Sequence, residues 1–313
     1  MRNVVMGDSL ISVVITAYNI EQFIGQAIES VLAQTYRNFE IIVIDDGSQD
    51  GTAEVCRRYG HNIIYHWQNN SGVAGARNTG IRLAHGELVA MLDGDDYWYP
   101  EKLAKQVETL QQHKEADFIC TDHRYLIDGK ESCYTSFDRN AFVRELAVKQ
   151  SGDSVILRRK DLPRFFRNPF GHTSSSLFRR ALLLAVGGYD VRFSVAEDMH
   201  LWFRYLAECR SFAAIRHPLI VYRIRNGSAT RNPMARGNEQ SSRAYEDLLH
   251  TLKAKHPDLA AALRYQVRTA RLNWIYALLR EGRRHDAIQV GLKALAFGMD
   301  WRIIKVLAGA IIR

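Results

Sequence analysis

The first 125 residues alternate short apolar runs with stretches in which apolar residues recur at helical spacing. Residues 12–17 are a short β-branched run, and residues 40–45 are nearly all apolar, which is typical of a strand buried on both faces. Strands that alternate with helical stretches indicate a mostly parallel sheet covered by helices on both sides. The rest of this region predicts strands at 63–65, 88–92 and 118–121 and helices at 21–33, 52–59, 73–84 and 100–113.

Beyond residue 149 the pattern changes twice. From about Gln240 onward every stretch predicts helix, with an interruption at Gly282. We therefore expect an α/β fold that is followed by an α-helical C-terminal extension. Residues 149–230 are mixed, with strands predicted at 154–157, 174–178, 212–215 and 219–224 and helices at 181–186 and 197–209. The expected boundaries are 1–236 for the α/β region, with halves at 1–125 and 126–236, and 237–313 for the extension.

The charge of the chain is concentrated in the predicted extension. The 313 residues have a formal net charge of +8, and residues 237–313 hold 13 basic and 7 acidic side chains. A basic segment can bind nucleic acid or an anionic membrane surface, or it can be a solvated helix face. Its basic residues are interleaved with apolar ones and form no recognisable nucleic-acid-binding module, so we expect no nucleic-acid partner.

Residues 300–313 and the four cysteines bear on where in the cell the protein is found. Residues 300–313 predict a basic amphipathic helix, which either makes peripheral contact with the inner membrane face or packs on the α/β region. No apolar stretch approaches the roughly 20 residues that cross a bilayer, and the N-terminal residues do not predict a secretory signal. Because the four cysteines lack the spacing of a metal site, we expect them to be reduced in a cytoplasmic protein.

Polar residues follow three of the predicted strands. Residues 16–19 read Thr-Ala-Tyr-Asn, residues 45–48 read Asp-Asp-Gly-Ser, and residues 93–98 read Asp-Gly-Asp-Asp-Tyr-Trp. Parallel sheets bind ligands at the carboxyl ends of their strands, so these residues are expected to share one rim. Taken alone, however, residues 45–48 are also a common turn sequence.

The acidic cluster of Asp93, Asp95 and Asp96 favours a cation site. Three carboxylates within four residues repel one another and add little stability, and a divalent cation would relieve the repulsion. Mg²⁺ or Mn²⁺ prefers oxygen ligands and commonly bridges protein carboxylates and substrate phosphates. The cluster therefore predicts a cation that neutralises charge on a departing diphosphate group.

Two other segments offer charged side chains. The glycine-containing stretch 69–78 is neither a GxGxxG fingerprint nor a P-loop, and its Arg77 either holds phosphate oxygens, pairs with a rim aspartate, or does both. Glu197 and Asp198 come at a predicted helix start, where the helix dipole favours carboxylates. A carboxylate in a cleft can also take a proton from an acceptor hydroxyl, and the spacing alone does not separate these two roles.

Several segments, in this order and at this spacing, resemble the family 2 glycosyltransferases of bacteria, which have the A-type glycosyltransferase fold. They cover about residues 10–230 and read SVVITAYN, IESVLAQTYRNFEIIVIDDGSQDGT, NSGVAGARNTGIRLAHGELVAMLDGDDYWYPEKL, SSSLFRRALLLAVGGYD, AEDMHLWFR and LIVYRIRNGSATR. The resemblance implies a Rossmann-like nucleotide-diphospho-sugar transferase sheet. It also implies a metal-dependent, inverting transfer from a nucleotide-sugar donor, usually a UDP-sugar, with Mn²⁺ or Mg²⁺ as cofactor. The acceptor would be a hydroxyl of a glycan or lipid-linked glycan in bacterial surface polysaccharide (O-antigen, capsule or exopolysaccharide) synthesis.

The same resemblance assigns residues on the donor side. Thr16 and Tyr18 match the nucleoside-pocket positions, and Asp46 matches the aspartate that accepts a hydrogen bond from uracil. Arg77 matches an arginine near the donor. Asp93 matches the first aspartate of the DxD motif, which contacts the ribose or completes the site.

On the metal and acceptor side, the resemblance makes Asp95 the metal ligand and Asp198 the general base, with Glu197 supporting the acceptor side. The family often has a histidine two residues after the YR of the late loop, where this chain has Arg225. Arg223 and Arg225 are expected to bind the diphosphate as that loop closes over the donor.

Two other functions fit parts of the pattern. A non-catalytic nucleotide-sugar-binding relative would keep the donor residues, but the full set that includes Asp198 argues against lost activity. Phosphatases of the haloacid dehalogenase type also place DxD after a buried strand, usually with Thr or Val two residues beyond the second Asp. Here Asp96 and Tyr97 follow Asp95, and the motif lies on the fourth predicted strand, so a phosphatase is disfavoured.

Overall fold

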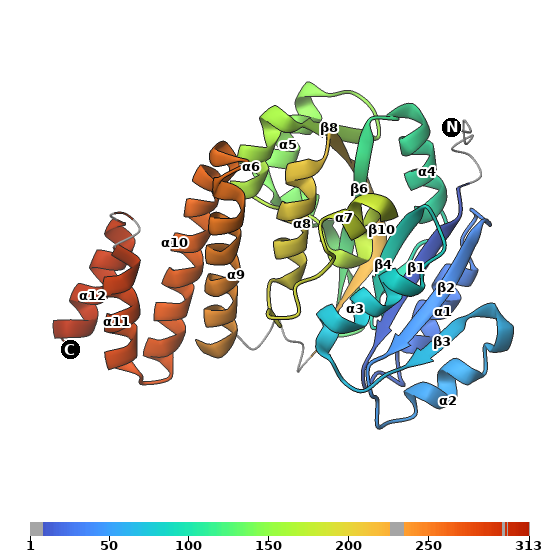
Figure 1. Cartoon of the computed structure of the whole chain (residues 1–313), viewed down its shortest axis with the longest axis horizontal. Coiled ribbons are helices and arrows are strands. Elements are labelled where there is room, and N and C mark those ends of the chain that lie inside the picture. The colour runs from blue at the N-terminus through green and yellow to red at the C-terminus, as the bar shows by residue number, and fades with distance from the viewer. Residues whose placement is uncertain (1–8, 226–234, 296–297, 299, 313) are drawn as a thin grey trace.

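The computed structural model describes residues 9–225, 235–295, 298 and 300–312. Within them one ten-stranded sheet runs through the α/β region (Figure 1). The strands are β1 Ile11–Ala17, β2 Phe39–Asp45, β3 Ile64–Trp67, β4 Leu88–Asp93, β5 Tyr97–Trp98, β6 Ala116–Ile127, β7 Lys130–Thr135, β8 Ser154–Arg158, β9 Leu177–Arg179 and β10 Ser211–Ile224. Their order is β3–β2–β1–β4–β9–β6–β10–β5, with β7 beside β6 and β8 beside β10.

The sheet is parallel where the sequence pattern is clearest. Strands β3, β2, β1 and β4 are parallel neighbours, as predicted, and β6 and β10 form a second parallel pair. Strand β9 runs antiparallel to both β4 and β6 and joins the two parallel parts, while β5, β7 and β8 are antiparallel to their partners. The sheet as a whole is therefore mixed. An apolar run in the sequence indicates that a strand is buried, but it does not indicate whether the strand runs parallel or antiparallel to its neighbours.

Helices cover both faces of the sheet, as expected. In β1, Val13 and Ile15 face one core cluster with α1, α2 and α4, whereas Val14 faces the other cluster with α3. This alternation follows from the two-residue period of a strand. The helices of the α/β region are α1 Ile24–Leu32, α2 Thr52–Arg57, α3 Gly72–Leu83, α4 Lys102–Gln112, α5 Ala141–Lys149, α6 Leu162–Arg167, α7 Arg180–Ala185 and α8 Glu197–Glu208.

The second half departs from the predicted elements in two places. The two strands predicted at 212–215 and 219–224 are one strand, β10, with register shifts against β6 on either side of Pro218. Proline donates no hydrogen bond, and the bulge accommodates it without ending the strand. The prediction of a strand over 174–178 is only partly right, because residues 173–175 form a 3₁₀ turn before β9 begins.

The C-terminal extension is helical, as predicted. Pro257 occupies the first turn of α10, and Gly282, with a φ of +76°, follows the end of that helix. Helix α9 packs against α8 and α10 packs against α6, while α12 packs on α10 and α11 (Figure 1). The helices are α9 Ala235–Lys253, α10 Pro257–Arg280, α11 Arg284–Leu295 and α12 Trp301–Ile312. The domain boundary at residue 236 stays a prediction.

Two smaller expectations can be compared with the structure. The four cysteines are unpaired, and three of them are buried while Cys133 is exposed. Among the residues described, no helix combines the length and the apolar character that a membrane span requires.

Candidate functional site

A cleft of about 530 Å³ opens at the carboxyl ends of β1, β2 and β4. It is completed by the turn before β9, by the start of α8 and by the end of β10. Nine of the residues predicted to form the site line it: Thr16, Tyr18, Asp46, Arg77, Asp93, Asp95, Glu197, Asp198 and Arg225. Two others do not: Asp96 is buried, and the Arg223 side chain contacts Gln26 and the Asp95 carbonyl oxygen.

The strand register sets the position of the DxD motif. Thr16 pairs with Asp93 across β1 and β4, and the Gly94 N–H donates to the Thr16 carbonyl oxygen at 3.0 Å. A Cβ added at Gly94 would lie 2.8 Å from that carbonyl oxygen and 2.5 Å from the Ile20 side chain. Only glycine therefore fits between the two aspartates, which are held against the end of β1.

The two aspartates that end β2 have different roles in the fold. Asp45 is buried and accepts hydrogen bonds from Ser48 N (2.9 Å) and the Tyr65 hydroxyl (2.7 Å), so it forms the turn. Asp46 lines the cleft, and Gln68 Nε2 donates to its Oδ1 at 2.6 Å. Asp45 therefore stabilises the turn, as a common turn sequence would, while the side chain of Asp46 lines the cleft. Tyr18 lies nearby and is 51% exposed.

Arg77 joins the two sides of the cleft. Its Nη2 lies 2.7 Å from Asp93 Oδ1 and its Nη1 lies 2.8 Å from Glu197 Oε1, with only 5% of the arginine side chain exposed. Burial disfavours the charge, but Asp93 and its neighbours outweigh this effect, and the pKa of Arg77 is raised well above its usual value. The pairing of Arg77 with a rim aspartate is therefore present in the fold.

Asp95 is held by the end of β10. Arg225 Nε lies 2.7 Å from Asp95 Oδ2, and Arg223 Nε donates to the Asp95 carbonyl oxygen at 2.8 Å. Arg223 also donates to Gln26 Oε1 at 2.6 Å, so its guanidinium is engaged in the protein. The late-loop segment 226–234, in which closure over the donor was expected, lies outside the described residues.

Asp96 is buried behind the motif. Ser174 Oγ donates to its Oδ2 at 2.6 Å, and the Arg223 N–H donates to its Oδ1 at 2.9 Å. Burial and the nearby carboxylates of Asp95 and Asp93 raise the pKa of Asp96 well above its usual value. Burial and Asp93 also raise the pKa of Asp95 in spite of Arg225. The three carboxyl groups are thus crowded, as their spacing in the sequence suggested.

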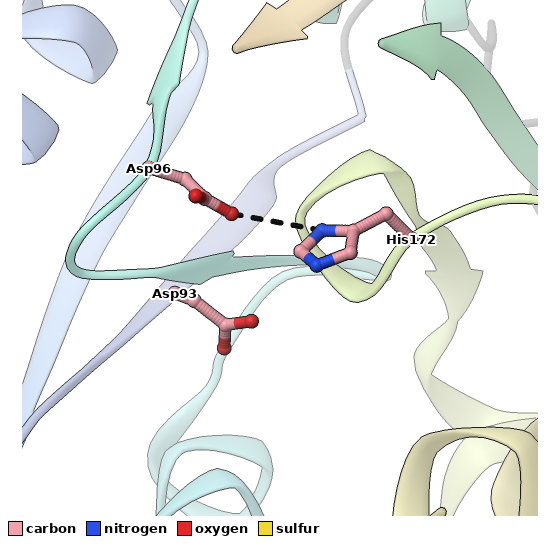
Figure 2. A group of neighbouring side chains, drawn as sticks. All are labelled: Asp93, Asp96 and His172. Carbon is pink, nitrogen blue, oxygen red and sulfur yellow. Dashed lines mark ion pairs between the residues drawn. The ribbon is translucent and has the colours of Figure 1, made fainter. Parts of the chain in front are cut away.

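No sequence pattern indicated His172, whose ring reaches this cluster. His172 Nδ1 lies 3.6 Å from Asp96 Oδ2, and Figure 2 shows the ring facing the carboxyl groups of both Asp96 and Asp93. One ligand atom from each of these three residues fits within 4.8 Å of the others. The signal that could have indicated it is the histidine just before the segment SSSLFRR. That segment was used only to identify the family.

Glu197 and Asp198 occupy the first turn of α8, after Ala196 in the left-handed conformation (φ +63°). Asp198 Oδ1 accepts from the Met199 N–H at 2.7 Å, so this carboxylate binds a free N–H of the helix start and also lines the cleft. Burial and the charge of Asp198 raise the pKa of Glu197 to about 7, although Arg77 opposes the shift. Asp198 can therefore accept a hydrogen bond from the start of the helix and also be available in the cleft.

Comparison with known proteins identifies the family. The model of Glycosyl transferase family 2 matches residues 12–187. An uncharacterized glycosyltransferase of Rickettsia typhi is 32% identical over 198 residues, which is 63% of this chain and 58%, less than two thirds, of that relative. The Escherichia coli protein WfaP, named a UDP-Glc:alpha-D-GlcNAc-diphosphoundecaprenol beta-1,3-glucosyltransferase, is 38% identical over 124 residues, covering 36% of this chain and 49% of WfaP.

Two solved structures share the fold. Staphylococcus aureus TarS 1–349 in complex with UDP-GlcNAc has a TM-score of 0.64 at 19% identity, covering 90% of this chain and 81% of TarS. The mannosyltransferase PcManGT from Pyrobaculum calidifontis, in complex with GDP-Man and Mn²⁺, has a TM-score of 0.57 at 20% identity, covering 96% and 79%. With the family match over more than half of its length, the chain belongs to glycosyl transferase family 2 and has the A-type glycosyltransferase fold.

Proposed function

We propose that this glycosyltransferase moves a sugar, with inversion, from a UDP-sugar donor to a hydroxyl of a glycan or lipid-linked acceptor in bacterial surface polysaccharide synthesis. The main support is that one cleft brings the DxD aspartates together with the carboxylates that start α8. The ligands named for TarS and PcManGT support a nucleotide-sugar donor. The name of WfaP supports a UDP-sugar and a lipid-linked acceptor.

The nucleoside end of the donor would bind near β1 and β2. Thr16 and Tyr18 would form the pocket wall, and Asp46 would accept a hydrogen bond from the base. The hydrogen bonds to Asp46 from Gln68 and Ser71 all reach Oδ1, which leaves Oδ2 available to the donor among the described residues. These contacts hold the Asp46 carboxylate in place before the nucleotide arrives, which reduces the entropy lost on binding.

The donor set of the acidic cluster fits a divalent cation. Asp93, Asp95 and Asp96 are crowded carboxyl groups, and oxygen ligands of this kind suit Mn²⁺ or Mg²⁺. Asp95 would hold the ion, with Asp93 completing the site or contacting the ribose. When bound, the cation would neutralise the charge that develops on the leaving diphosphate. Arg225 lines the same cleft and would donate to diphosphate oxygens.

Replacing Asp95 tests the metal assignment. We expect Asp95→Ala to lower the affinity for UDP about tenfold or more in Mn²⁺, because even the loss of a residue that only orients a metal ligand costs about 10–100-fold, and Asp95 is the proposed ligand itself. In EDTA the variant and the wild type should both lose binding of UDP, and calorimetry measures the affinity in both conditions. Asp153→Ala, which removes a carboxyl with a 67% exposed side chain, serves as the control. Undiminished metal-dependent binding by Asp95→Ala would remove the assignment.

Asp198 is proposed as the general base that takes the proton from the acceptor hydroxyl. Inversion requires one carboxylate opposite the leaving group, and the cation assists the departing diphosphate in place of an acid. Slow transfer to water tests the stereochemistry without a known acceptor. With an α-linked UDP-sugar that the protein binds, NMR should detect the β-anomer as the first free sugar. Initial formation of the α-anomer would contradict the inverting mechanism.

The pKa of Glu197 predicts a pH dependence. Since its pKa is raised to about 7, Glu197 is neutral in acid and becomes charged as the pH rises through that value. The added charge completes the pair with Arg77 and so fixes the acceptor side of the cleft, and the rate of transfer should rise near pH 7. In Glu197→Gln this limb of the pH profile should disappear. A profile that is unchanged in the variant would show that another group titrates.

Contact with the inner membrane face is a further part of the proposal, and it would place a cytoplasmic enzyme beside lipid-linked acceptors. In α12, Ile303 and Leu307 are buried, whereas Trp301 and Ile304 are 71% and 40% exposed. One side of α12 therefore packs on the neighbouring helices, while apolar side chains on another side stay exposed. Lys305 is exposed on the same helix and suits an anionic surface.

Vesicle binding tests the membrane contact. Removing residues 286–313 should abolish sedimentation with vesicles that contain phosphatidylglycerol, provided that circular dichroism shows the remainder to be folded. Trp301→Ser with Ile304→Ser keeps the chain length and should weaken binding by itself. Unchanged vesicle binding by the folded truncation would exclude this role for the C-terminal helices.

A further inference from the structure

His172 is fixed at the wall of the donor cleft by the turn that precedes β9. The Ser174 N–H donates to its Nδ1 at 3.3 Å, and its ring packs against Tyr222 with centroids 4.3 Å apart. The side chain is 19% exposed, so it is held by the fold and still reaches the cleft. The same turn supports the acidic motif, because the Asp93 N–H donates to Ser174 Oγ at 3.1 Å. The imidazole and the DxD motif therefore share one rigid support.

The carboxyl groups around His172 have unequal capacity to bind a cation. Both oxygens of Asp96 accept hydrogen bonds within the protein, from Ser174 and from the Arg223 backbone. At Asp93, Arg77 and Thr16 both reach Oδ1, and at Asp95 the Arg225 side chain reaches Oδ2. Each of these two aspartates thus keeps its other oxygen for a ligand, as far as the described residues show.

His172 lies within the electrostatic influence of these same groups. One of its ring nitrogens lies within 4.8 Å of a carboxylate oxygen of Asp93 and of one of Asp96. A neutral imidazole has a single lone pair, so binding a cation replaces the 3.3 Å contact from the Ser174 N–H: the lone pair is used either at Nδ1 or, with the Nδ1 proton directed at Asp96 Oδ2, at Nε2. The carboxylates supply the charge that balances a divalent ion. This is the chemistry of a mixed nitrogen and oxygen metal site.

We propose that His172 is a ligand of the divalent cation proposed for the DxD motif, beside Asp93, and that it makes the site prefer Mn²⁺ to Mg²⁺. The proposal rests on the proposed metal-dependent function and names the ligand that would set its metal preference. Mg²⁺ is a hard ion that favours oxygen ligands and retained waters, whereas transition metals bind imidazole more readily. Replacing the imidazole by an oxygen donor should therefore cost Mn²⁺ affinity and spare Mg²⁺.

The test uses the full chain with UDP and Mn²⁺ and detects coordination by electron spin-echo spectroscopy. The wild type should show a directly coordinated ¹⁴N nucleus, and His172→Gln should not. Gln keeps a side-chain acceptor for the Ser174 N–H, and thermal unfolding checks that the variant is folded. His200→Gln is the control, because His200 with Asp190 and Asp247 forms the other candidate metal-binding group found in the described residues.

Affinities provide the second readout. In His172→Gln the affinity for Mn²⁺ in the presence of UDP should fall about tenfold or more, and the ratio of Mn²⁺ to Mg²⁺ affinity should fall with it. Mn²⁺ bound with UDP but without a coordinated nitrogen would overturn the role of His172 and leave the proposed function standing. Loss of the nitrogen signal in His200→Gln but not in His172→Gln would also overturn it. Absence of Mn²⁺ and UDP binding by the wild type would overturn both proposals.

Discussion

Asp198→Asn is expected to abolish sugar transfer while the affinity for UDP stays close to that of the wild type. An amide has nearly the shape of the carboxylate and keeps an oxygen for the Met199 N–H, but it cannot take a proton from the acceptor. A positioned general base contributes about 10²–10⁴-fold to a rate, and the loss should lie in that range. The measurements are the initial rate of UDP release in the presence of acceptor and the calorimetric affinity for UDP.

Two control variants separate the loss of the proposed base from the loss of another carboxyl group on α8. Glu208→Gln removes a carboxyl from the other end of α8, where its side chain is 42% exposed, and should leave the rate unchanged. Glu197→Gln should alter the pH profile without the complete loss expected for Asp198→Asn. Transfer by Asp198→Asn at the wild-type rate would remove the residue from its assigned role and would leave the base unidentified.

Arg77→Met should destabilise the protein more than any other single change at the cleft. It removes the cation that pairs with Asp93 and Glu197 and leaves both carboxyl groups buried without it. Breaking a buried ion pair by removing one partner costs about 3–5 kcal/mol, and the urea midpoint should fall accordingly. Transfer should also be lost, because the carboxylates on the donor and acceptor sides are no longer held in one geometry.

The control for Arg77 is an exposed arginine. Arg57 pairs with Glu54 at 3.1 Å, with 63% and 61% of the side chains exposed, and Arg57→Met should change the free energy of unfolding by less than about 1 kcal/mol. The double variant Arg77→Met with Glu197→Gln should recover part of the stability, since one unpaired charge is removed. A midpoint in Arg77→Met equal to that of the wild type would show that the bridge contributes little to the fold.

The first half of the fold could be predicted because burial on both faces leaves a strong pattern. The apolar runs of β1 and β2 and the helical spacing between them identified the parallel strands, and the polar residues after each strand identified the rim. Most of the elements in residues 126–171 could not be predicted in this way. There β7, α5 and α6 are short and partly exposed, and their placement depends on contacts with distant elements that no local pattern records.

The site shows the same limit. The DxD carboxylates, Asp46 and the pair at the start of α8 could be named because each follows a strand or begins a helix. That Arg77 would bridge Asp93 and Glu197, which lie far apart in the chain, could not be predicted, although pairing with a rim aspartate was one of the alternatives. His172 was missed because it comes from a short turn, and its proximity to Asp96 arises only when β9 is inserted beside β4.

The most direct test of the account is a calorimetric titration of the purified protein with UDP and a panel of UDP- and TDP-sugars, in Mn²⁺ and in EDTA. Binding is expected to require the cation, and the sugar nucleotide that binds most tightly identifies the donor to use in transfer assays. Absence of binding by any of these nucleotides, with or without metal, would contradict the proposed donor site and favour a relative that has lost its activity.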